Sequence, residues 1–266
     1  MPMRFPTSST AVAAAPAQPA PTGPAPVRRV QRVRHELRRR DVQVLRSEAV
    51  GPNFLSLTFG GESLSDFVSD SFDDHVKFMF DAGGDEMVRR DYTPRRFDRV
   101  ARELTLEFAL HGHGTASDWA RQAAPGAPAV IGGPRGSMII PADYDWHLLA
   151  GDASALPAIH RRLEELPAGA RAIVLVQVPH ADDRRAMHSA ADVQLQWVHD
   201  DVAWLRALAD LELPAGDGFA WCAGEARLMP QAREIVLQGH GIARESARVA
   251  AYWKQGASDF HERLEG

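Results

Sequence analysis

The sequence is very poor in cysteine, with Cys222 the single thiol among 266 residues. One thiol excludes a disulfide framework, a cysteine-ligated zinc site and a bound iron–sulfur cluster. Cys222 lies inside an apolar run, so we expect a small buried residue and not a nucleophile. This cysteine usage fits a reducing, cytoplasmic compartment.

Long apolar runs are also absent, and no segment reaches the roughly 20 apolar residues that a membrane span requires. Lysine is scarce, with only Lys77 and Lys254, and the formal net charge is −5. This charge balance argues against nucleic acid as the main partner. We expect a monomer that acts on a small molecule.

The first 34 residues lack the pattern of a folded segment. Residues 1–27 are rich in Ala and Pro, without the unbroken apolar run of a signal peptide. Residues 28–40 hold seven arginines against one acid, Glu36. We predict a disordered tail over residues 1–34, with the basic stretch as an exposed lead-in to the first strand. An arm that contacts nucleic acid or lipid is the alternative for the basic stretch.

The rest of the chain divides near residue 143 into two predicted domains. The full chain is 45% hydrophobic, which is enough for two cores. Short runs that alternate at period two, such as residues 55–59 and 76–80, predict a six-stranded antiparallel barrel over residues 35–143. The continuous apolar run 172–178 indicates a parallel strand covered on both faces. We therefore predict a doubly wound parallel-sheet α/β domain over residues 144–266.

Further strands and helices of the second domain follow from the same patterns. Expected strands cover residues 146–150, 194–198, 219–223 and 248–253, and expected helices cover residues 156–166, 204–211 and 229–238. Strands thus alternate with helices, as a parallel sheet requires.

The most informative stretch is Arg90-Asp91-Tyr92-Thr93-Pro94-Arg95. Successive side chains of an extended segment point to opposite faces, so Arg90 and Tyr92 share one side. Thr93 and Arg95 take the other side. A guanidinium, an aromatic ring and a hydroxyl together suit a flat anionic ligand such as a flavin dinucleotide. An edge strand with exposed arginines is the alternative.

A second stretch combines a strand, a glycine turn and a helix start. Residues 104–110 alternate as a strand, His111–Gly114 supply the turn, and Ser117 with Asp118 predicts a helix over residues 118–123. Such a helix N-terminus suits the pyrophosphate of a flavin dinucleotide. The spacing also imitates a nicotinamide-binding fingerprint, but no βαβ unit with a ribose-binding acid follows it.

Histidines at this turn raise the question of a metal site. His111 and His113 lie two residues apart at a strand end and could reach one ion. No third ligand with suitable spacing accompanies them. We expect a structural or flavin-adjacent role instead.

Six stretches of the chain resemble the siderophore-interacting protein family, the flavin-dependent ferric-siderophore reductases of the ferredoxin-reductase superfamily. They are Arg90-x-Tyr92-Thr93-x-Arg95-Arg96-Phe97-Asp98, His111-Gly112-x-Gly114-x-Ala116-Ser117-x-Trp119-Ala120, Gly132-Gly133-Pro134-Arg135-Gly136-Ser137, Ala150-Gly151-Asp152-x-Ser154-Ala155-Leu156-Pro157-Ala158-Ile159, Ala223-Gly224-Glu225 and Tyr252-Trp253-x-x-Gly256. The resemblance spans about residues 35–256, in the family's order. Thr115 departs from the family's usual proline, and Pro94 from a small aliphatic residue.

The resemblance implies a bound FAD. It implies that Tyr92 and Thr93 lie at the reacting centre, with Tyr92 stacked on the isoalloxazine ring and Thr93 bonded near N5. It also implies that Arg90 and the turn ending at Ser117 hold the pyrophosphate. The expected FAD contacts are Arg90, Tyr92, Thr93, Arg95, His111, Gly112, Gly114, Thr115, Ala116 and Ser117.

The resemblance also implies a nicotinamide site in the second domain, where ligands bind beyond the carboxyl ends of parallel strands. The expected contacts are Asp152, Ser154, Ala155, Gly224, Glu225 and Trp253. Plain helix capping is the alternative for Asp152 and Ser154.

The choice of nicotinamide cofactor depends on the loop after residue 178. Arg184 and Arg185 would attract the 2′-phosphate of NADPH. Asp182 and Asp183 beside them would favour the ribose hydroxyls of NADH. We expect NADPH, with NADH as the alternative.

The implied reaction is the reduction of a ferric siderophore. NAD(P)H delivers two electrons as hydride and ferric iron accepts one, so a flavin is needed between them. Lys77, Arg135 and Lys254 are the expected contacts for an anionic siderophore, and Arg244 is a further candidate. The alternatives are a flavin reductase that serves a protein acceptor, such as a ferredoxin or an oxygenase, and a non-catalytic siderophore carrier.

Overall fold

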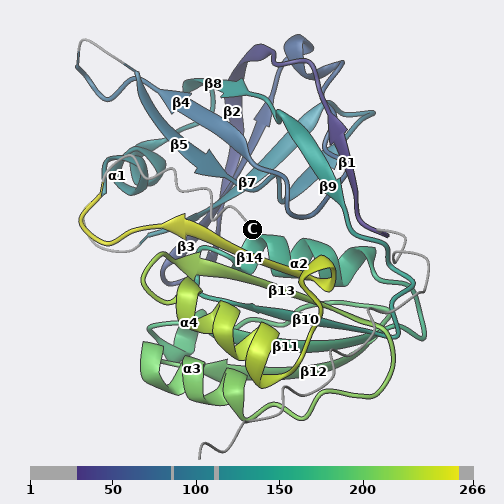
Figure 1. Ribbon diagram of the computed structural model, residues 1–266. Helices are drawn as coiled ribbons and strands as arrows, with labels where there is room; N and C mark the ends of the chain where they lie inside the picture. The colour runs from purple at the N-terminus through teal and green to yellow at the C-terminus, as the bar shows by residue number, and fades with distance from the viewer. Residues whose placement is uncertain (1–28, 85–86, 111–113, 258–266) are drawn as a thin grey trace, which may run out of the picture.

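The computed structural model describes residues 29–84, 87–110 and 114–257. In this part the chain forms an antiparallel sheet and a parallel sheet, which are two distinct halves of the molecule. Helix α2 (Leu156–Glu165) lies between the two halves (Figure 1). No helix in these ranges is long and apolar enough to cross a membrane.

The first half is built on a seven-stranded antiparallel sheet in the order β5-β4-β8-β2-β3-β7-β6. Its strands are β2 (Arg39–Gly51), β3 (Phe54–Gly60), β4 (Val76–Phe80), β5 (Val88–Tyr92), β6 (Arg96–Asp98), β7 (Glu103–Ala109) and β8 (Pro128–Gly132). Helix α1 (Thr115–Gln122) follows β7 and packs on β3, β5 and β7. One core, rich in phenylalanine, fills this half.

The predicted strand number of six is wrong, and no pairing joins the two edge strands within the described residues. An additional strand arises because Pro94 has no N–H to donate and divides the extended stretch into β5 and β6. These two strands lie at opposite edges of the sheet, yet only Thr93–Arg95 separates them along the chain. The two edges therefore approach each other at this short link, which contains predicted FAD contacts.

Part of the predicted tail is ordered as a strand. Residues 31–34 form β1 (Gln31–Arg34), which pairs antiparallel with β9 (Gly136–Ile139) in a separate two-stranded sheet. The backbone N–H and C=O groups of the basic stretch thus find partners in a strand far along the chain. Residues 1–28 lie outside the described ranges.

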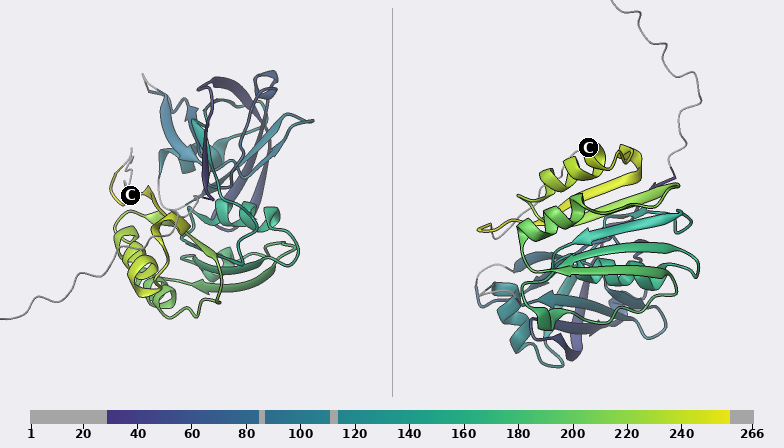
Figure 2. Two further views of the ribbon diagram at one scale, coloured as in Figure 1. Left: turned by 45° about the vertical axis from the view of Figure 1, so that its right-hand side comes forward. Right: turned by 90° about the horizontal axis from the view of Figure 1, so that it is seen from below.

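The second half is a five-stranded parallel sheet in the order β12-β11-β10-β13-β14. Its strands are β10 (Trp146–Gly151), β11 (Arg171–Gln177), β12 (Asp192–Val198), β13 (Gly218–Glu225) and β14 (Ala247–Trp253). Helices α3 (Asp201–Ala209) and α4 (Met229–Glu234) cover the face opposite α2, on the near side of the view from below (Figure 2). Short helical turns cover Glu62–Leu64, Ala181–Asp183, Ile235–Gly239 and Arg244–Ser246. The predicted parallel sheet with helices on both faces is confirmed.

Alternate residues of the parallel strands face two different cores. Leu149 and Val174 pack in the core that contains α2, which also takes Phe54 and Phe72 from the antiparallel half. Cys222 packs in the other core, which contains α3 and α4. Burial raises the pKa of this thiol to about 12, so the expectation of a buried, unreactive cysteine is confirmed.

Candidate active site

Arg90 and Tyr92 lie on one face of β5, as the alternation predicts. Both are half-buried, whereas the residues on either side of Arg90 are exposed. The Tyr92 ring lies with its centroid 4.3 Å from that of Phe108 and meets Phe78 edge-on at 5.7 Å. Burial raises the pKa of Tyr92 above its ordinary range, so the phenol stays protonated. The strand therefore presents a fixed aromatic ring beside a cation.

Helix α1 begins at Thr115, earlier than predicted. Gly114 is its N-cap, with extended backbone angles and no side-chain cap bond. Ser117 is not the cap, because its hydroxyl lies inside the first turn and donates to the Ala109 carbonyl at 3.2 Å. The first N–H groups of a helix have no partner within it, so this end can hold an anion. His111 and Gly112, predicted for the same turn, lie outside the described residues.

An aromatic cluster joins α1 to β5. The Trp119 ring of α1 lies 5.0 Å from Phe78 and 6.5 Å from Phe108. These rings also contact Tyr92, so the helix, the cation and the aromatic ring belong to one region, as predicted. The set fits a flavin dinucleotide, since it offers a ring surface together with two groups that attract a pyrophosphate.

Thr93 lies where this region meets the parallel half. It follows β5 directly and is 7% exposed. The carbonyl of the next residue, Pro94, accepts a hydrogen bond from Arg161 of α2.

Asp152 is the centre of a second cluster, at the carboxyl ends of β10, β13 and β14. Its carboxylate accepts from the Ser154 N–H and hydroxyl at 2.8 and 2.6 Å. It also accepts from the Glu225 N–H at 2.9 Å and from the Trp253 indole at 2.7 Å. A Cβ on Gly224 would stand 2.7 Å from Asp152 Oδ2, so the backbone approaches too closely for a larger residue. The structure thus brings the predicted nicotinamide contacts together.

Two details of this cluster refine the prediction. Ala155 is fully buried at the start of α2, against Gly151. The Asp152 carboxylate already accepts four hydrogen bonds from the protein, which supports a part in shaping the loop. Direct contact of these residues with a nicotinamide stays a prediction.

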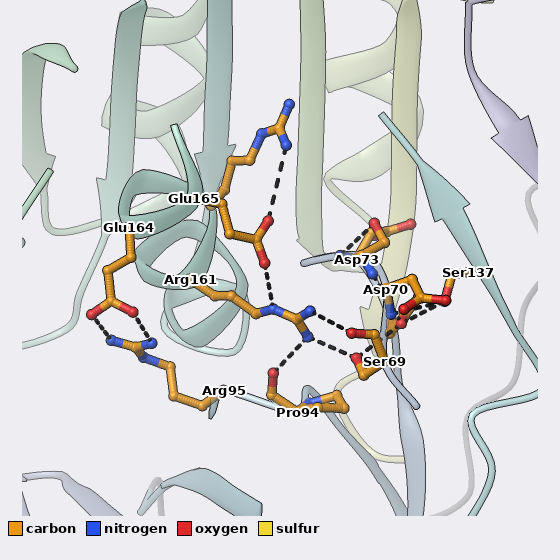
Figure 3. A network of polar contacts seen from close by, with 12 residues as sticks. Ser69, Asp70, Asp73, Pro94, Arg95, Ser137, Arg161, Glu164 and Glu165 are labelled. Atoms are coloured by element: carbon orange, nitrogen blue, oxygen red, sulfur yellow. Dashed lines mark hydrogen bonds and ion pairs between the residues drawn. The ribbon is translucent and has the colours of Figure 1, made fainter. Parts of the chain in front are cut away.

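Arg95 lies in a polar network between the halves (Figure 3). It is 8% exposed, donates to both oxygens of Glu164 at 2.7 and 2.8 Å and lies 3.3 Å from Glu107. Two carboxylates therefore surround the guanidinium that the resemblance assigns to FAD. An FAD contact of Arg95 stays a prediction, and its visible contacts join α2 to the antiparallel sheet.

Arg161 is a second bridge between the halves. From α2 it donates to the Pro94 carbonyl at 2.9 Å and to the Ser69 hydroxyl and carbonyl at 2.8 and 3.0 Å. Glu165 holds the same guanidinium from within α2 at 2.8 Å. Because Pro94 follows Thr93, this network fixes the backbone beside a predicted FAD contact.

The loop after β11, which contains the expected 2′-phosphate site, contacts the antiparallel half. Arg185 pairs with Glu107, and Asp183 accepts from the Asn53 N–H and side-chain amide at 3.0 and 2.9 Å. Buried charges require partners, and the partners of Arg185 and Asp183 lie across the junction between the two halves. Arg184 is the cation left exposed on this loop.

The three predicted siderophore contacts come from different elements. Lys77 on β4 pairs with Asp91 at 2.9 Å and lies opposite Gly132 in the β4–β8 pairing, so it is near the stretch that contains Arg135. Arg135 and Lys254 are exposed. Lys254 follows β14, in the other half. The structure brings the first two near each other, and a site for all three stays a prediction.

Metal ligands do not gather in the described ranges, where no three or more His, Cys, Asp or Glu residues are placed to hold an ion. His111 and His113 lie outside those ranges. The metal alternative for these two histidines stays open.

Two family models match this chain, one in each half. The model described as siderophore-interacting protein matches residues 144–256. The siderophore-interacting FAD-binding domain matches residues 43–89 and 81–138.

Individual proteins resemble the chain over most of its length. The NADPH-dependent ferric-chelate reductase of Escherichia coli is 36% identical over 246 residues, covering 84% of this chain and 96% of that protein. The ferric vibriobactin reductase ViuB of Vibrio cholerae is 30% identical, covering 82% and 91%. The crystal structure of a siderophore utilization protein from T. fusca is 30% identical with a TM-score of 0.82, covering 87% and 98%.

Proposed function

Since this chain belongs to the siderophore-interacting protein family, we propose that it is an FAD-dependent reductase that uses NAD(P)H to reduce the ferric iron of a siderophore. Relatives named for the reduction of ferric chelates and ferric vibriobactin support this activity. The chemistry that FAD supplies when bound is the conversion of a hydride donor into single-electron delivery to iron.

The observation that supports the proposal most is a connection between the antiparallel half and the predicted nicotinamide site. The Tyr252 hydroxyl donates to Asp73, a buried carboxylate of the antiparallel half, and the indole of the next residue, Trp253, donates to Asp152 of the nicotinamide set. Hydride transfer requires the reacting atoms to be about 3–3.5 Å apart, so the two cofactors must meet. Neighbouring residues of β14 that contact the antiparallel half and the nicotinamide set support a meeting place beside this strand.

The proposed FAD site belongs to residues 35–143. In this proposal the Tyr92 ring supports the isoalloxazine, Thr93 faces N5, and Arg90 with the N-terminus of α1 holds the pyrophosphate. No side chain needs to act as a nucleophile or general base. The residues bind the cofactors, orient them and exclude water, because the cofactor itself carries out the electron transfer.

The proposed NAD(P)H site belongs to residues 144–266. Asp152 ties together the loops that contain Ser154, Ala155, Gly224 and Glu225, at the edge where parallel sheets bind nucleotides. Trp253 is 42% exposed and lies on the same cluster. It is therefore accessible to a nicotinamide that enters between the halves.

NADPH is the proposed electron donor, with NADH as a weaker substitute. Arg184 is exposed and donates to His199 Nε2 at 2.6 Å. Both lie just beyond the carboxyl ends of adjacent strands, β11 and β12, where a 2′-phosphate would need positive charge. The name of the Escherichia coli relative favours the same cofactor.

The proposed substrate is an anionic ferric siderophore. Lys77, Arg135 and Lys254 would attract it electrostatically. Reduction weakens the hold of hard oxygen ligands on iron, so electron delivery is enough to start iron release.

Stopped-flow spectroscopy on the FAD-loaded protein tests the proposal. NADPH should bleach the flavin band faster than NADH does, and added ferric siderophores should restore it faster than oxygen does. Reoxidation by ferredoxin but by no ferric siderophore would instead indicate a reductase for a protein acceptor. A colourless protein that takes up no FAD but binds ferric siderophores would indicate a carrier.

A further inference from the structure

Three strands of the antiparallel sheet place two cations on either side of a glycine. Gly132 of β8 pairs with Arg39 of β2 on one side and with Lys77 of β4 on the other. Residues that lie directly opposite each other in a sheet point to the same face. Neighbouring strands are about 4.8 Å apart, so the Cα atoms of Arg39 and Lys77 lie roughly 10 Å apart. The residue between them has no side chain.

This row of residues is on the outer face of the sheet. Arg39 is exposed, whereas the next residue, Arg40, is buried. Lys77 lies opposite Asp91 of β5, so Arg90, the residue before Asp91, points to the other face. The row is therefore separate from the predicted pyrophosphate partner of FAD.

The turn after β8 carries a third cation, Arg135. The buried Arg40 guanidinium donates to the Gly133 carbonyl at 3.0 Å. The His35 N–H donates to the Arg135 carbonyl, also at 3.0 Å. These two hydrogen bonds hold the turn at both ends. The backbone of Arg135 therefore has a fixed position close to Gly132.

Two cations of this surface have no ion-pair partner among the described residues. They are Arg39 and Arg135, which pair with no carboxylate there. The neighbouring Arg38 differs, because both Glu36 and Asp66 pair with it. The whole chain has a formal net charge of −5, so this surface is a local exception. Uncompensated positive charge of this kind attracts an anion.

We propose that Arg39 is a further siderophore contact, which acts with Lys77 and Arg135 on an anionic ferric siderophore. This inference rests on the proposed function, which supplies the other two contacts. Lys77 follows Val76, which pairs with Tyr92, so the row lies beside the predicted flavin partner. A ferric complex of three catecholate groups is a trianion, whereas a complex of three hydroxamate groups is neutral. The Arg39 charge therefore favours the catecholate class.

The test is the affinity of the FAD-loaded protein for two gallium(III) complexes, measured by titration calorimetry. Gallium(III) replaces ferric iron because it accepts no electron from the flavin. One ligand is a hexadentate tricatecholate and the other a hexadentate trihydroxamate. Arg39→Gln should weaken binding of the tricatecholate complex about fivefold, the size of one exposed ion pair, and leave the neutral complex unaffected. Arg39→Lys keeps the charge and should restore most of the affinity.

Arg171→Gln is the matched control, since Arg171 is also exposed at the start of a strand but lies on β11 in the parallel half. It should leave both affinities unchanged. Equal binding of the tricatecholate complex by the wild type and Arg39→Gln, or an equal loss in Arg171→Gln, would overturn the assignment of Arg39 alone. A wild-type protein that takes up no FAD, or whose reduced flavin no ferric siderophore reoxidises, would overturn the proposed function.

Discussion

Removal of the Arg161 guanidinium should loosen the junction between the two halves. The side chain is 13% exposed and makes three hydrogen bonds to Ser69 and Pro94 of the antiparallel half. Hydrogen bonds that involve a charged group contribute about 1.5–3 kcal/mol each. Water can reach part of the vacated site and recover some of this. We therefore expect Arg161→Ala to lower the free energy of unfolding by about 3 kcal/mol.

Urea unfolding followed by far-ultraviolet circular dichroism measures this loss. Arg161→Lys keeps the charge but not the planar fork, so it should restore no more than about 1 kcal/mol. Arg206→Ala is the matched control, since Arg206 also lies on a helix with a carboxylate partner but is 82% exposed. It should change the free energy of unfolding by no more than about 0.5 kcal/mol. Equal effects of the Arg161 and Arg206 variants would refute the assignment of Arg161 to the junction.

Three further outcomes are expected. Arg90→Ala should weaken FAD binding by about 1.5–3 kcal/mol through loss of a charged pyrophosphate partner; calorimetry showing unchanged affinity would contradict that role. Arg184→Ala should raise the KM for NADPH and not for NADH, and equal changes would remove Arg184 from the 2′-phosphate site. Burial lowers the pKa of His147 and of His160 to about 4. As the pH falls, these two histidines therefore take up protons in the unfolded chain before they do so in the folded chain. The free energy of unfolding should then fall as the pH drops from about 6.5 to 4. Equal urea midpoints at pH 7 and 5 would contradict this.

The pattern of apolar residues predicted the parallel half well, because that pattern is local. The run over residues 172–178 became β11 (Arg171–Gln177), and the stretch over residues 156–166 became α2. Each prediction depends only on residues that are close together along the chain. The antiparallel half was harder to predict from the sequence, because Pro94 ends a strand inside a stretch that alternates on both sides of it.

The candidate site shows the same limit. Arg90 and Tyr92 share a face because they are two residues apart, and the sequence contains that information. Glu164 is 69 residues from Arg95, Glu107 is 78 residues from Arg185 and Trp221 is 148 residues from Asp73, and no local pattern encodes these pairs. A charged side chain in a sequence therefore predicts a ligand contact and an internal ion pair equally well.

Arginine serves the junction in a way that lysine could not. Arg95, Arg161 and Arg185 each contact at least one group of the opposite half, and their forked donors can satisfy two acceptors at once. One of the resulting contacts holds the short link between β5 and β6, because Arg161 donates to the carbonyl of Pro94, the residue after Thr93. A contact that joins the halves thus also fixes the backbone beside the proposed N5 partner. A substitution that weakens the junction should therefore also change the environment of the flavin, even without touching it.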